Sequence, residues 1–215
     1  MLKSIGLFFI LFIWMGLQAE NPAIYLEGRL PESNGRYKTF YEVLRLMSER
    51  GVKTIVETGT ERWLEAKNSF DGDGGSTIIF SHWAFNNKAQ MYSVDIDQNH
   101  IAYSTNNTFA YKSNLTLILQ DSVEFLKYFP NKIDFLYLDS FDTNEYNPGP
   151  SQDHCLKEVK AAEDKLTDKS IIMIDDCNVT GGGKGKLAIE YMLSKGWQLH
   201  RNYHQVILVK PRRIK

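Results

Sequence analysis

Lys53-Thr-Ile-Val-Glu-Thr-Gly-Thr60 and Met91-Tyr-Ser-Val-Asp-Ile-Asp97 are each an apolar run that ends in a carboxylate. Runs of this kind are typical of parallel strands buried on both faces. The carboxyl ends of such strands meet at one edge of the sheet, where open α/β sheets bind ligands. A glycine turn follows the first acid, and the second acid comes one βα unit later. This spacing suits the polar tail and the ribose of a nucleoside-containing cofactor, so we expect a cofactor site at this edge.

Strand-like and helix-like segments alternate through most of the chain. After an amphipathic helix over 36–50, the pattern predicts strand 53–58, helix 76–86, strand 90–95, helix 98–111, strand 115–119, helix 121–128, strand 132–138, helix 152–166, strand 170–175 and helix 184–195. Such alternation indicates a parallel sheet covered by helices on both faces. The last runs, 198–203 and 205–209, have no helix between them and predict an antiparallel hairpin at the sheet edge. The expected fold is α/β, a doubly wound, mostly parallel sheet of seven strands with a C-terminal antiparallel hairpin.

Composition limits the partners of this fold. The chain has 215 residues, of which 43% are hydrophobic and 24% charged, as expected for one globular domain over residues 20–215. The formal net charge of -1 provides no long-range field for a polyanion, and the basic cluster 210–215 is interpreted as a solvated tail. We therefore expect a small-molecule substrate and no nucleic acid.

The amino-terminal segment has a different composition. Lys3 precedes an apolar run over residues 5–17, and Ala19 follows as a candidate cleavage residue. The run is short for a membrane span and matches the core of a signal peptide, so residues 1–19 are interpreted as a signal peptide or membrane anchor. Leu17 is large for the position three residues before the cleavage point, which keeps an uncleaved anchor open. If translation begins at Met15, most of the run is never made and the protein is cytoplasmic.

Residues after the first strand are suited to the polar tail of a cofactor. Gly59 lets the backbone approach a ligand, Thr60 follows it, and the Glu57 carboxylate is placed for an ammonium group or a bound water. Asp71-Gly-Asp-Gly-Gly-Ser-Thr77 leads into a helix, where Gly75 and Ser76 leave free amides for a carboxylate. The alternative for this second segment is an ordinary surface loop with a capping hydroxyl.

The next two strands also end in acceptors. Asp95 is suited to accept hydrogen bonds from two vicinal ribose hydroxyls. Asp97 is expected to cap the following helix. Asp121 and Ser122 close the third strand, where a side-chain acceptor could take an adenine amino group, and a capping role there can coexist with that function.

Three further acids end the fourth and fifth strands. Asp139 ends one, and Asp175 and Asp176 end the other. Carboxylates that converge on one sheet edge repel one another unless they are protonated or neutralised, and a hard cation such as Mg²⁺ is a common remedy. The alternative is that one acid caps a helix or pairs with a nearby lysine while the others are solvated.

His154 is the candidate general base. It lies one turn from Glu158 at the start of a predicted helix, so both can face one cleft. Imidazole titrates near neutrality and can take a proton from a hydroxyl. The alternative is an ordinary surface or hydrogen-bonding histidine.

The order of these motifs resembles the class I S-adenosylmethionine-dependent methyltransferases, in particular the small O-methyltransferase and cephalosporin-hydroxylase-like group, over about residues 36–210. The resemblance rests on Val56-Glu-Thr-Gly-Thr60, Gly74-Gly-Ser-Thr77, Ser93-Val-Asp-Ile-Asp97, Gln120-Asp-Ser122, Tyr137-Leu-Asp139, Ile174-Asp-Asp176 and the closing hairpin. It implies a Rossmann-like fold and S-adenosylmethionine as the methyl donor.

The resemblance also implies roles for single residues. Glu57, Gly59 and Thr60 would line the methionine part of the cofactor, with Gly75 and Ser76 near its carboxylate. Asp95 would hold the ribose, Ile96 would pack on adenine, and Asp121 and Ser122 would approach the adenine edge. In metal-dependent members, acids at the positions of Asp139, Asp175 and Asp176 hold Mg²⁺, which orients the substrate oxygen.

Two features depart from the family pattern. About ten residues separate Thr60 from the glycines that follow Asp71. Catechol-type relatives carry a lysine three residues after the first metal acid, whereas this chain has Asp142 there, which leaves His154 as the substitute base.

Three functions follow from these observations. The first is methyl transfer to a hydroxyl of a small molecule or sugar, with Mg²⁺ assistance as a further expectation. The second is a non-catalytic binding module of the same fold that is exported, because an exported enzyme would lack a cytosolic methyl donor. The third, a nicotinamide-dependent oxidoreductase, is disfavoured because Gly-x-Gly-x-x-Gly is absent from the sequence.

Overall fold

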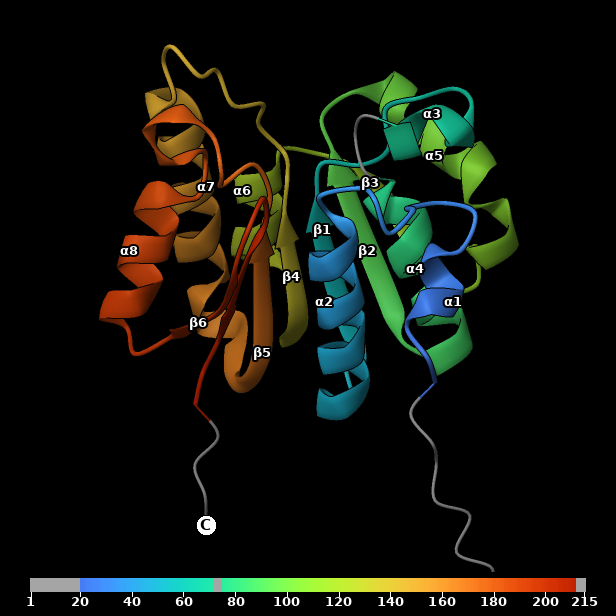
Figure 1. The fold of residues 1–215 in the computed structure, drawn as a ribbon, viewed down its shortest axis with the longest axis horizontal. Coiled ribbons are helices and arrows are strands. Elements are labelled where there is room, and N and C mark those ends of the chain that lie inside the picture. Colours follow the sequence, from blue (N-terminus) through green and yellow to red (C-terminus); the bar gives the residue numbers. More distant parts are fainter. Residues whose placement is uncertain (1–19, 72–74, 212–215) are drawn as a thin grey trace, which may run out of the picture.

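The structure, a computed structural model, describes residues 20–71 and 75–211. The predicted signal peptide or anchor at 1–19 lies outside these residues, as do 72–74 of the predicted carboxylate-binding loop and 212–215 of the basic tail. One sheet of seven strands runs through the described part, in the order β3-β2-β1-β4-β5-β7-β6 (Figure 1). The strands are β1 (Thr54–Thr58), β2 (Gln90–Asp95), β3 (Leu115–Leu119), β4 (Ile133–Leu138), β5 (Leu166–Ile174), β6 (Gln198–Asn202) and β7 (Val206–Val209).

The strand directions confirm the predicted fold class. Strands β1 to β5 pair in parallel, and β7 pairs antiparallel with both β5 and β6. The predicted C-terminal hairpin therefore closes one side of the sheet, with β6 as its outer strand. The order of the strands across the sheet reverses between β1 and β4. Strands β2 and β3 are added outward from β1 on one side, and the later strands are added outward from β4 on the other. Open α/β sheets bind ligands at the carboxyl ends of the strands beside such a switch point.

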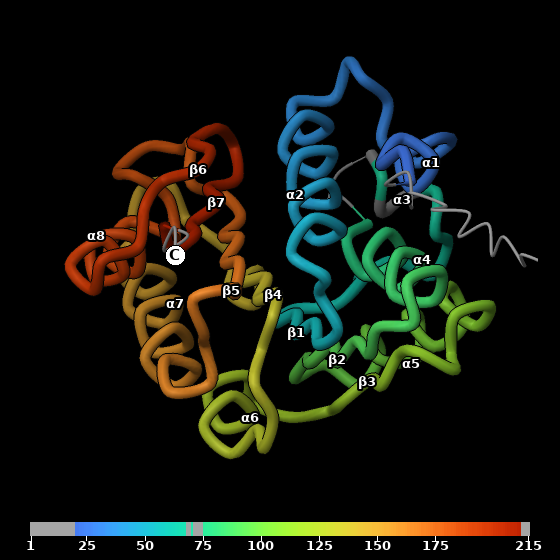
Figure 2. The backbone as a smooth tube through the Cα atoms, turned by 90° about the horizontal axis from the view of Figure 1, so that it is seen from below, coloured from blue at the N-terminus to red at the C-terminus, as the bar shows by residue number. Residues whose placement is uncertain are grey.

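Helices cover both faces of this sheet (Figure 2). The helices are α1 (Ala23–Leu26), α2 (Tyr37–Arg50), α3 (Ala66–Asp71), α4 (Ser76–Asn87), α5 (Gln98–Asn107), α6 (Ser122–Tyr128), α7 (Gly149–Ala162) and α8 (Lys186–Ser194). Helices α1, α2 and α4 pack on one face through a core that includes Phe40, Phe80 and Trp83. Helices α6, α7 and α8 pack on the other face, where Val159 and Met192 are buried. Alternate residues of the central strands enter the two cores, as expected for strands buried on both faces.

Several predicted segments differ from the structure in their bounds. The strand expected over 170–175 begins at Leu166, and α7 already ends at Ala162. The helix expected over 152–166 begins at Gly149, since Pro150 in the first turn supplies a preset helical φ without an apolar pattern to reveal it. The helix expected over 98–111 ends at Asn107, and a separate 3-10 turn follows at Phe109–Tyr111. The segment between β1 and α4, for which no element was predicted, contains the short helix α3.

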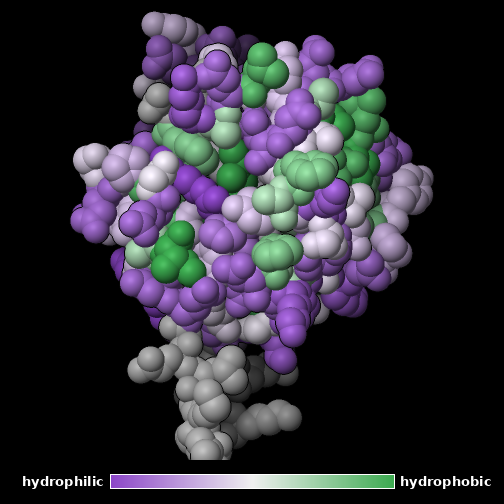
Figure 3. Space-filling view, turned by 90° about the vertical axis from the view of Figure 1, so that its right-hand side faces the viewer, coloured by the Kyte–Doolittle hydropathy of each residue, from purple (hydrophilic) through white to green (hydrophobic). Residues whose placement is uncertain are grey.

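The surface over α1, α4 and α5 is mainly hydrophilic, with apolar residues in small separate groups (Figure 3). Scattered apolar residues of this kind are ordinary on a solvated surface. None of the helices within residues 20–71 and 75–211 has the length and apolar character needed to cross a membrane.

Candidate cofactor and active site

Two adjoining cavities lie at the carboxyl ends of β1, β2 and β4, beside the switch point. The first has a volume of about 220 Å³ and the second about 290 Å³. Both are lined by Gly59, Asp95, Ile96 and Ser140, so they form one groove. Eight of the nine residues predicted to bind the cofactor line this groove: Gly59, Thr60, Gly75, Ser76, Asp95, Ile96, Asp121 and Ser122. The sequence pattern thus identified residues that the fold brings together from four separate segments.

Gly59 fixes the first loop of the groove against β4. Its φ of 81° lies in the left-handed region that favours glycine, and its N–H donates to the Val94 carbonyl at 2.8 Å. A Cβ at this position would lie 2.4 Å from the carbonyl oxygen of Asp139. Only glycine therefore allows the loop after β1 to reach this close to the end of β4.

The Asp95 carboxylate is held in place at the floor of the groove. Oδ2 accepts from the Thr60 N–H at 3.0 Å and lies 3.2 Å from His100 Nδ1, while Oδ1 accepts from the Asp97 N–H at 2.8 Å. The side chain remains 10% exposed, so it can still accept hydrogen bonds from a ligand. Asp97 itself caps α5 by accepting from the Asn99 N–H, as predicted.

The second cavity is the more apolar end of the groove. Ile96 is 76% exposed and lines it together with Val94 and the ring of Phe141. Asp121 and Ser122 lie at the same end, and Asp121 caps α6 by accepting from the Glu124 N–H at 2.9 Å. A flat apolar surface beside polar acceptors is the combination that a purine ring requires.

Glu57, the ninth predicted residue, does not line the groove. It is fully buried behind it, where its Oε2 accepts from Ser93 Oγ at 2.5 Å and from Thr77 Oγ1 at 2.8 Å. Its Oε1 has no hydrogen-bond partner. Burial raises the pKa of Glu57 to about 7. In this structure the carboxyl group supports the start of α4 from behind instead of facing an ammonium group in the cavity.

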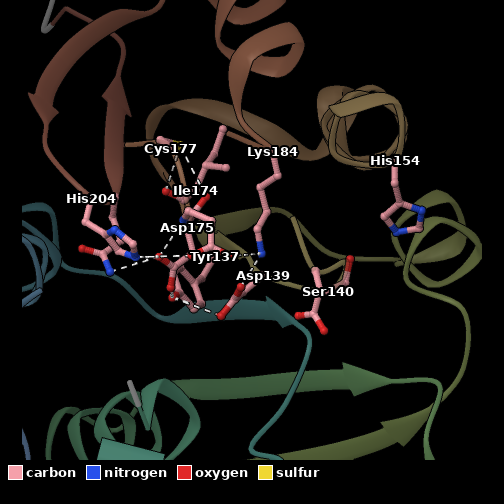
Figure 4. Close-up of polar contacts among 12 residues, drawn as sticks. Tyr137, Asp139, Ser140, His154, Ile174, Asp175, Cys177, Lys184 and His204 are labelled. Atoms are coloured by element: carbon pink, nitrogen blue, oxygen red, sulfur yellow. Dashed lines mark hydrogen bonds and ion pairs between the residues drawn. The ribbon is translucent and has the colours of Figure 1, made fainter. Parts of the chain in front are cut away.

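The acidic end of the groove contains a buried lysine that the sequence analysis did not identify (Figure 4). Lys184 is 2% exposed, and its Nζ lies 2.6 Å from Asp139 Oδ1 and 3.2 Å from Asp176 Oδ2. Although burial opposes it, the charges of these two acids raise the pKa of Lys184 far above its ordinary value. The ammonium therefore stays charged at neutral pH.

Asp139 is the acid of this cluster that reaches the cavity. It lines the first cavity with a side chain that is 17% exposed. Burial raises the pKa of Asp139 to about 8, with Lys184 opposing the shift. A carboxylate with a pKa near neutrality is suited to take and release a proton.

Asp175 and Asp176 are engaged with protein groups. Asp175 is 3% exposed; its Oδ2 accepts from the Tyr137 hydroxyl, and its Oδ1 from Gln205 Nε2 at 3.1 Å and the Asp176 N–H at 2.7 Å. His204 Nε2 lies 3.3 Å from Asp176 Oδ1. Despite burial, His204 and Lys184 lower the pKa of Asp176 well below its usual range.

The expected Mg²⁺ ligand set does not fit this geometry. Among the described residues, the acids and histidines close enough to share a metal are Asp175, Asp176 and His204, and Asp139 is not in that group. One oxygen of Asp139, Oδ1, is already paired with the Lys184 ammonium at 2.6 Å. The pairing of an acid with a nearby lysine, one part of the alternative, is present, but Asp176 is paired as well and Asp175 is buried instead of solvated.

A glycine-rich turn delivers Lys184 to the acids. A Cβ on Gly183 would lie 1.8 Å from the Asp176 carbonyl oxygen, and a Cβ on Gly185 would lie 2.5 Å from Cys177 Sγ. Gly183 also has a φ of 60°. The run Gly181-Gly-Gly-Lys-Gly185 therefore packs directly on the residues that follow β5. That run was the signal available in the sequence, because so many glycines around one lysine indicate close backbone approach.

His154 lies away from the acidic cluster, at the apolar end of the groove (Figure 4). Its Nε2 is 3.1 Å from Ser122 Oγ and 3.6 Å from Glu158 Oε1, so the predicted pairing across one helical turn is present. A hydrogen bond to Glu158 raises the pKa of His154. Glu158 also accepts from Ser140 Oγ at 2.7 Å. This position does not suit the predicted general base, because it lies beside Asp121 and Ser122 and not beside Asp139.

Known proteins resemble this chain in domain family and in fold. Residues 72–177 match the family model of a methyltransferase domain. A search of curated proteins found no match. The fold and the family match together support assignment to the class I S-adenosylmethionine-dependent methyltransferases.

Three solved structures illustrate the similarity of fold. NSun6 from Pyrococcus horikoshii, solved with SFG, has a TM-score of 0.59 and 13% identity over 79% of this chain and 50% of its own. MycE from the mycinamycin biosynthetic pathway, solved with Mg, SAH and mycinamycin VI, has a TM-score of 0.59 and 14% identity over 90% of this chain and 53% of its own. A Klebsiella pneumoniae protein assigned as an O-methyltransferase has a TM-score of 0.53 and 14% identity over 90% of this chain and 88% of its own. The chain thus spans about half the length of the first two.

Proposed function

We propose that this protein transfers a methyl group from S-adenosylmethionine to a hydroxyl oxygen of a small molecule or sugar. The observation that carries the proposal is the continuous groove at the switch point, with an apolar end at Ile96 and Phe141 and an acidic end at Asp139. A nucleoside with a charged tail requires both ends, and an oxygen nucleophile requires a proton acceptor beside the tail.

The chain's own residues give each part of the donor a binding partner. Ile96 provides the apolar surface for adenine, and Asp121 and Ser122 provide acceptors at its edge. Asp95 is placed for the ribose hydroxyls. Gly75 and Ser76, at the start of α4, provide backbone amides for the carboxylate of the methionine tail. When bound, S-adenosylmethionine supplies the transferable methyl group on a sulfonium.

Asp139 is the residue we assign to the proton of the acceptor. Its carboxyl group lines the first cavity, and burial raises its pKa to about 8, so that its ionised form is a stronger proton acceptor than an ordinary carboxylate. Lys184, Gly59 and the end of β4 fix its position. The remaining contribution of the protein is orientation, since a correctly placed oxygen and methyl carbon need little further chemistry.

Magnesium assistance is a second version of this function. It is favoured by the Asp175, Asp176 and His204 group, whose ligand atoms lie within 4.8 Å of one another. The Mg in the MycE structure belongs to that protein and is compatible with this version. The ion pairs of Lys184 favour the version without a metal, and we derive no step through Mg²⁺.

A non-catalytic exported or anchored binding module is the alternative from another class. It is favoured by the apolar run at 5–17, which is also the basis for expecting export or membrane association. Mass spectrometry of the amino terminus in the native host would decide between cleavage after Ala19, retention, and a start at Met15. A mature protein that begins at Glu20 and is found outside the cytosol would favour the binding module.

Calorimetry on the full-length protein tests the donor site. We expect S-adenosylmethionine and S-adenosylhomocysteine to bind with micromolar dissociation constants, and absence of heat at millimolar ligand would reject the enzyme. Release of S-adenosylhomocysteine is then measured with panels of sugars, polyols, phenols and amines. Turnover with amines and none with hydroxyl compounds would reject the oxygen acceptor while leaving the methyltransferase in place.

A further inference from the structure

The cluster around Lys184 has the charge balance of a metal site without requiring a metal. Three carboxylates, those of Asp139, Asp175 and Asp176, converge where β4 and β5 end. Their mutual repulsion in a buried site is costly unless a cation lies among them. The Lys184 ammonium bonds two of the three directly, and His204 lies beside the other side of Asp175 and Asp176.

The position of the ammonium is built into the fold. Lys184 Nζ is hydrogen-bonded to Asp139 Oδ1, which lies 45 residues away in the sequence. The glycines on both sides of Lys184 pack on Asp176 and Cys177 too closely for any side chain. The Gln152 side chain adds two hydrogen bonds to this turn, from Nε2 to the carbonyl oxygens of Gly181 and Gly183 at 3.1 and 3.0 Å. A long, flexible lysine is thereby held at one point, which an incidental surface ion pair would not require.

A divalent cation cannot share this position with the ammonium. A cation that ligates Asp139 through Oδ1 and Asp176 through Oδ2 needs the two oxygens that Lys184 contacts, and the ammonium strongly repels a second cation at bonding distance from them. Asp175 has little to offer in its place, since both of its oxygens already accept hydrogen bonds. The position between these two oxygens therefore has one occupant, and the chain supplies it.

We infer that the Lys184 ammonium replaces a divalent cation at the acidic end of the groove, so that Asp139 is positioned by a residue of the chain and the site does not take up Mg²⁺. Lys184 is a positioning residue, because it is buried and reaches the cavity only through Asp139. This inference concerns the metal site alone; its consequence for the acceptor rests on the proposed function.

That consequence is a restriction on the acceptor. A bound divalent cation selects molecules that offer two adjacent oxygens, since both can enter its coordination shell. A buried ammonium whose hydrogen bonds go to carboxylates offers no such pair of coordination positions. The acceptor then needs a single hydroxyl, whose proton passes to Asp139 as the oxygen forms its bond to the methyl carbon and the carbon–sulfur bond breaks. We infer an acceptor class of isolated alcohols or phenols that need no vicinal partner oxygen.

Manganese titration tests the metal site without any acceptor. Binding of Mn²⁺ to the full-length protein is followed by water proton relaxation for the wild type, Lys184→Met and Lys184→Arg. We expect the wild type not to bind Mn²⁺ below about 1 mM, the concentration range in which weak carboxylate sites bind divalent cations. Lys184→Met frees the oxygens of Asp139 and Asp176. This variant should bind Mn²⁺ at least about tenfold more tightly than the wild type, which corresponds to about 1.4 kcal/mol. Lys184→Arg keeps the charge and should behave as the wild type.

The wild type alone is sufficient to overturn the inference. Submillimolar Mn²⁺ binding that is lost in Asp176→Asn would show that the acidic end takes up a metal, even if Lys184→Met fails to fold. Equal Mn²⁺ affinity in wild type and Lys184→Met would also overturn it. Calorimetry with S-adenosylhomocysteine on the same samples separates the two proposals: no binding there rejects the methyltransferase function and leaves the metal result unaffected. Once an acceptor that is methylated has been found, we expect EDTA to leave the methyl-transfer rate unchanged. Removing a vicinal hydroxyl from that acceptor should also leave the rate unchanged.

Discussion

The backbone N–H of Thr60 donates a hydrogen bond to Asp95 Oδ2 at 3.0 Å. This bond joins the loop after β1 to the acid that ends β2, so the two sequence motifs that predicted a cofactor site are also mechanically connected. Its effect is to aim the Asp95 carboxylate while leaving capacity for further hydrogen bonds. A ligand that bonds Asp95 therefore also stabilises the loop that carries Gly59 and Thr60.

Asp95→Ala should lower the affinity for S-adenosylhomocysteine by about 10- to 100-fold. The substitution removes the acceptors for the ribose hydroxyls, and hydrogen bonds to a charged group contribute about 1.5–3 kcal/mol each. Isothermal titration calorimetry measures the change. Asp153→Ala, an exposed acid in α7 with no part in the groove, is the matched control and should bind as the wild type. Unchanged affinity of Asp95→Ala would show that the ribose lies elsewhere.

Gly59→Ala should abolish cofactor binding and destabilise the protein more than glycine replacement at an open site. The added Cβ meets the Asp139 carbonyl oxygen at 2.4 Å, so the loop must move in addition to adopting a strained φ. Gly196→Ala is the control, because Gly196 has nearly the same φ, 84° against 81°, and open space around it. We expect about 1–2 kcal/mol of strain for Gly196→Ala by urea unfolding and a larger loss for Gly59→Ala. Equal losses would mean that the close contact has no energetic consequence.

Most of the fold follows from local sequence patterns. The apolar runs that became β1, β2, β4 and β5 are long enough and apolar enough to indicate buried parallel strands, and the lack of a helix between β6 and β7 gave the hairpin. The groove followed as well, since the residues after parallel strands must meet at one edge. Asp95 was correctly placed there because its position depends only on the end of a strand.

The differences from the sequence pattern concern side chains whose surroundings are set by distant segments. Glu57 ends β1, but hydroxyls from α4 and β2 enclose it behind the groove. Lys184 lies at no strand end, and only the folded glycine turn brings it to Asp139. His154 was predicted to share a cleft with Glu158 as a candidate base, and α7 places it beside Ser122. Strand pattern predicts which edge a residue reaches, and tertiary packing decides which way its side chain faces.

His154→Gln should weaken S-adenosylhomocysteine binding by a few fold. His154 Nε2 lies 3.1 Å from Ser122 Oγ, and both residues line the apolar end of the groove, so its loss releases a group that we assign to the adenine edge. One hydrogen bond contributes about 1 kcal/mol. His200→Gln is the control, because His200 also contacts a carboxylate, that of Glu42, but lies outside the groove. If His154 were instead the general base for the acceptor, His154→Gln would leave the affinity for S-adenosylhomocysteine unchanged and would lower turnover by about a hundredfold or more.

Glu57→Gln should flatten the dependence of stability on pH between about 4.5 and 7. Burial raises the pKa of Glu57 from 4.5 to about 7, so in this window the folded protein holds a proton that the unfolded chain has released. The contribution of Glu57 to stability is therefore complete below pH 4.5 and is lost as the pH rises to 7, by at most about 3 kcal/mol at 1.36 kcal/mol for each pH unit.

Urea unfolding of wild type and Glu57→Gln at intervals from pH 4.5 to 8 measures this difference. Subtracting the two curves removes the slopes of all other groups, including Asp139, whose pKa is also raised. The amide introduces a donor where Oε1 has no partner, which shifts the variant's curve by a constant amount and leaves its slope unaffected. We expect the wild type to lose stability relative to the variant as the pH rises. Parallel curves would show that Glu57 is ionised throughout, as it would be if a cation reached Oε1 in solution.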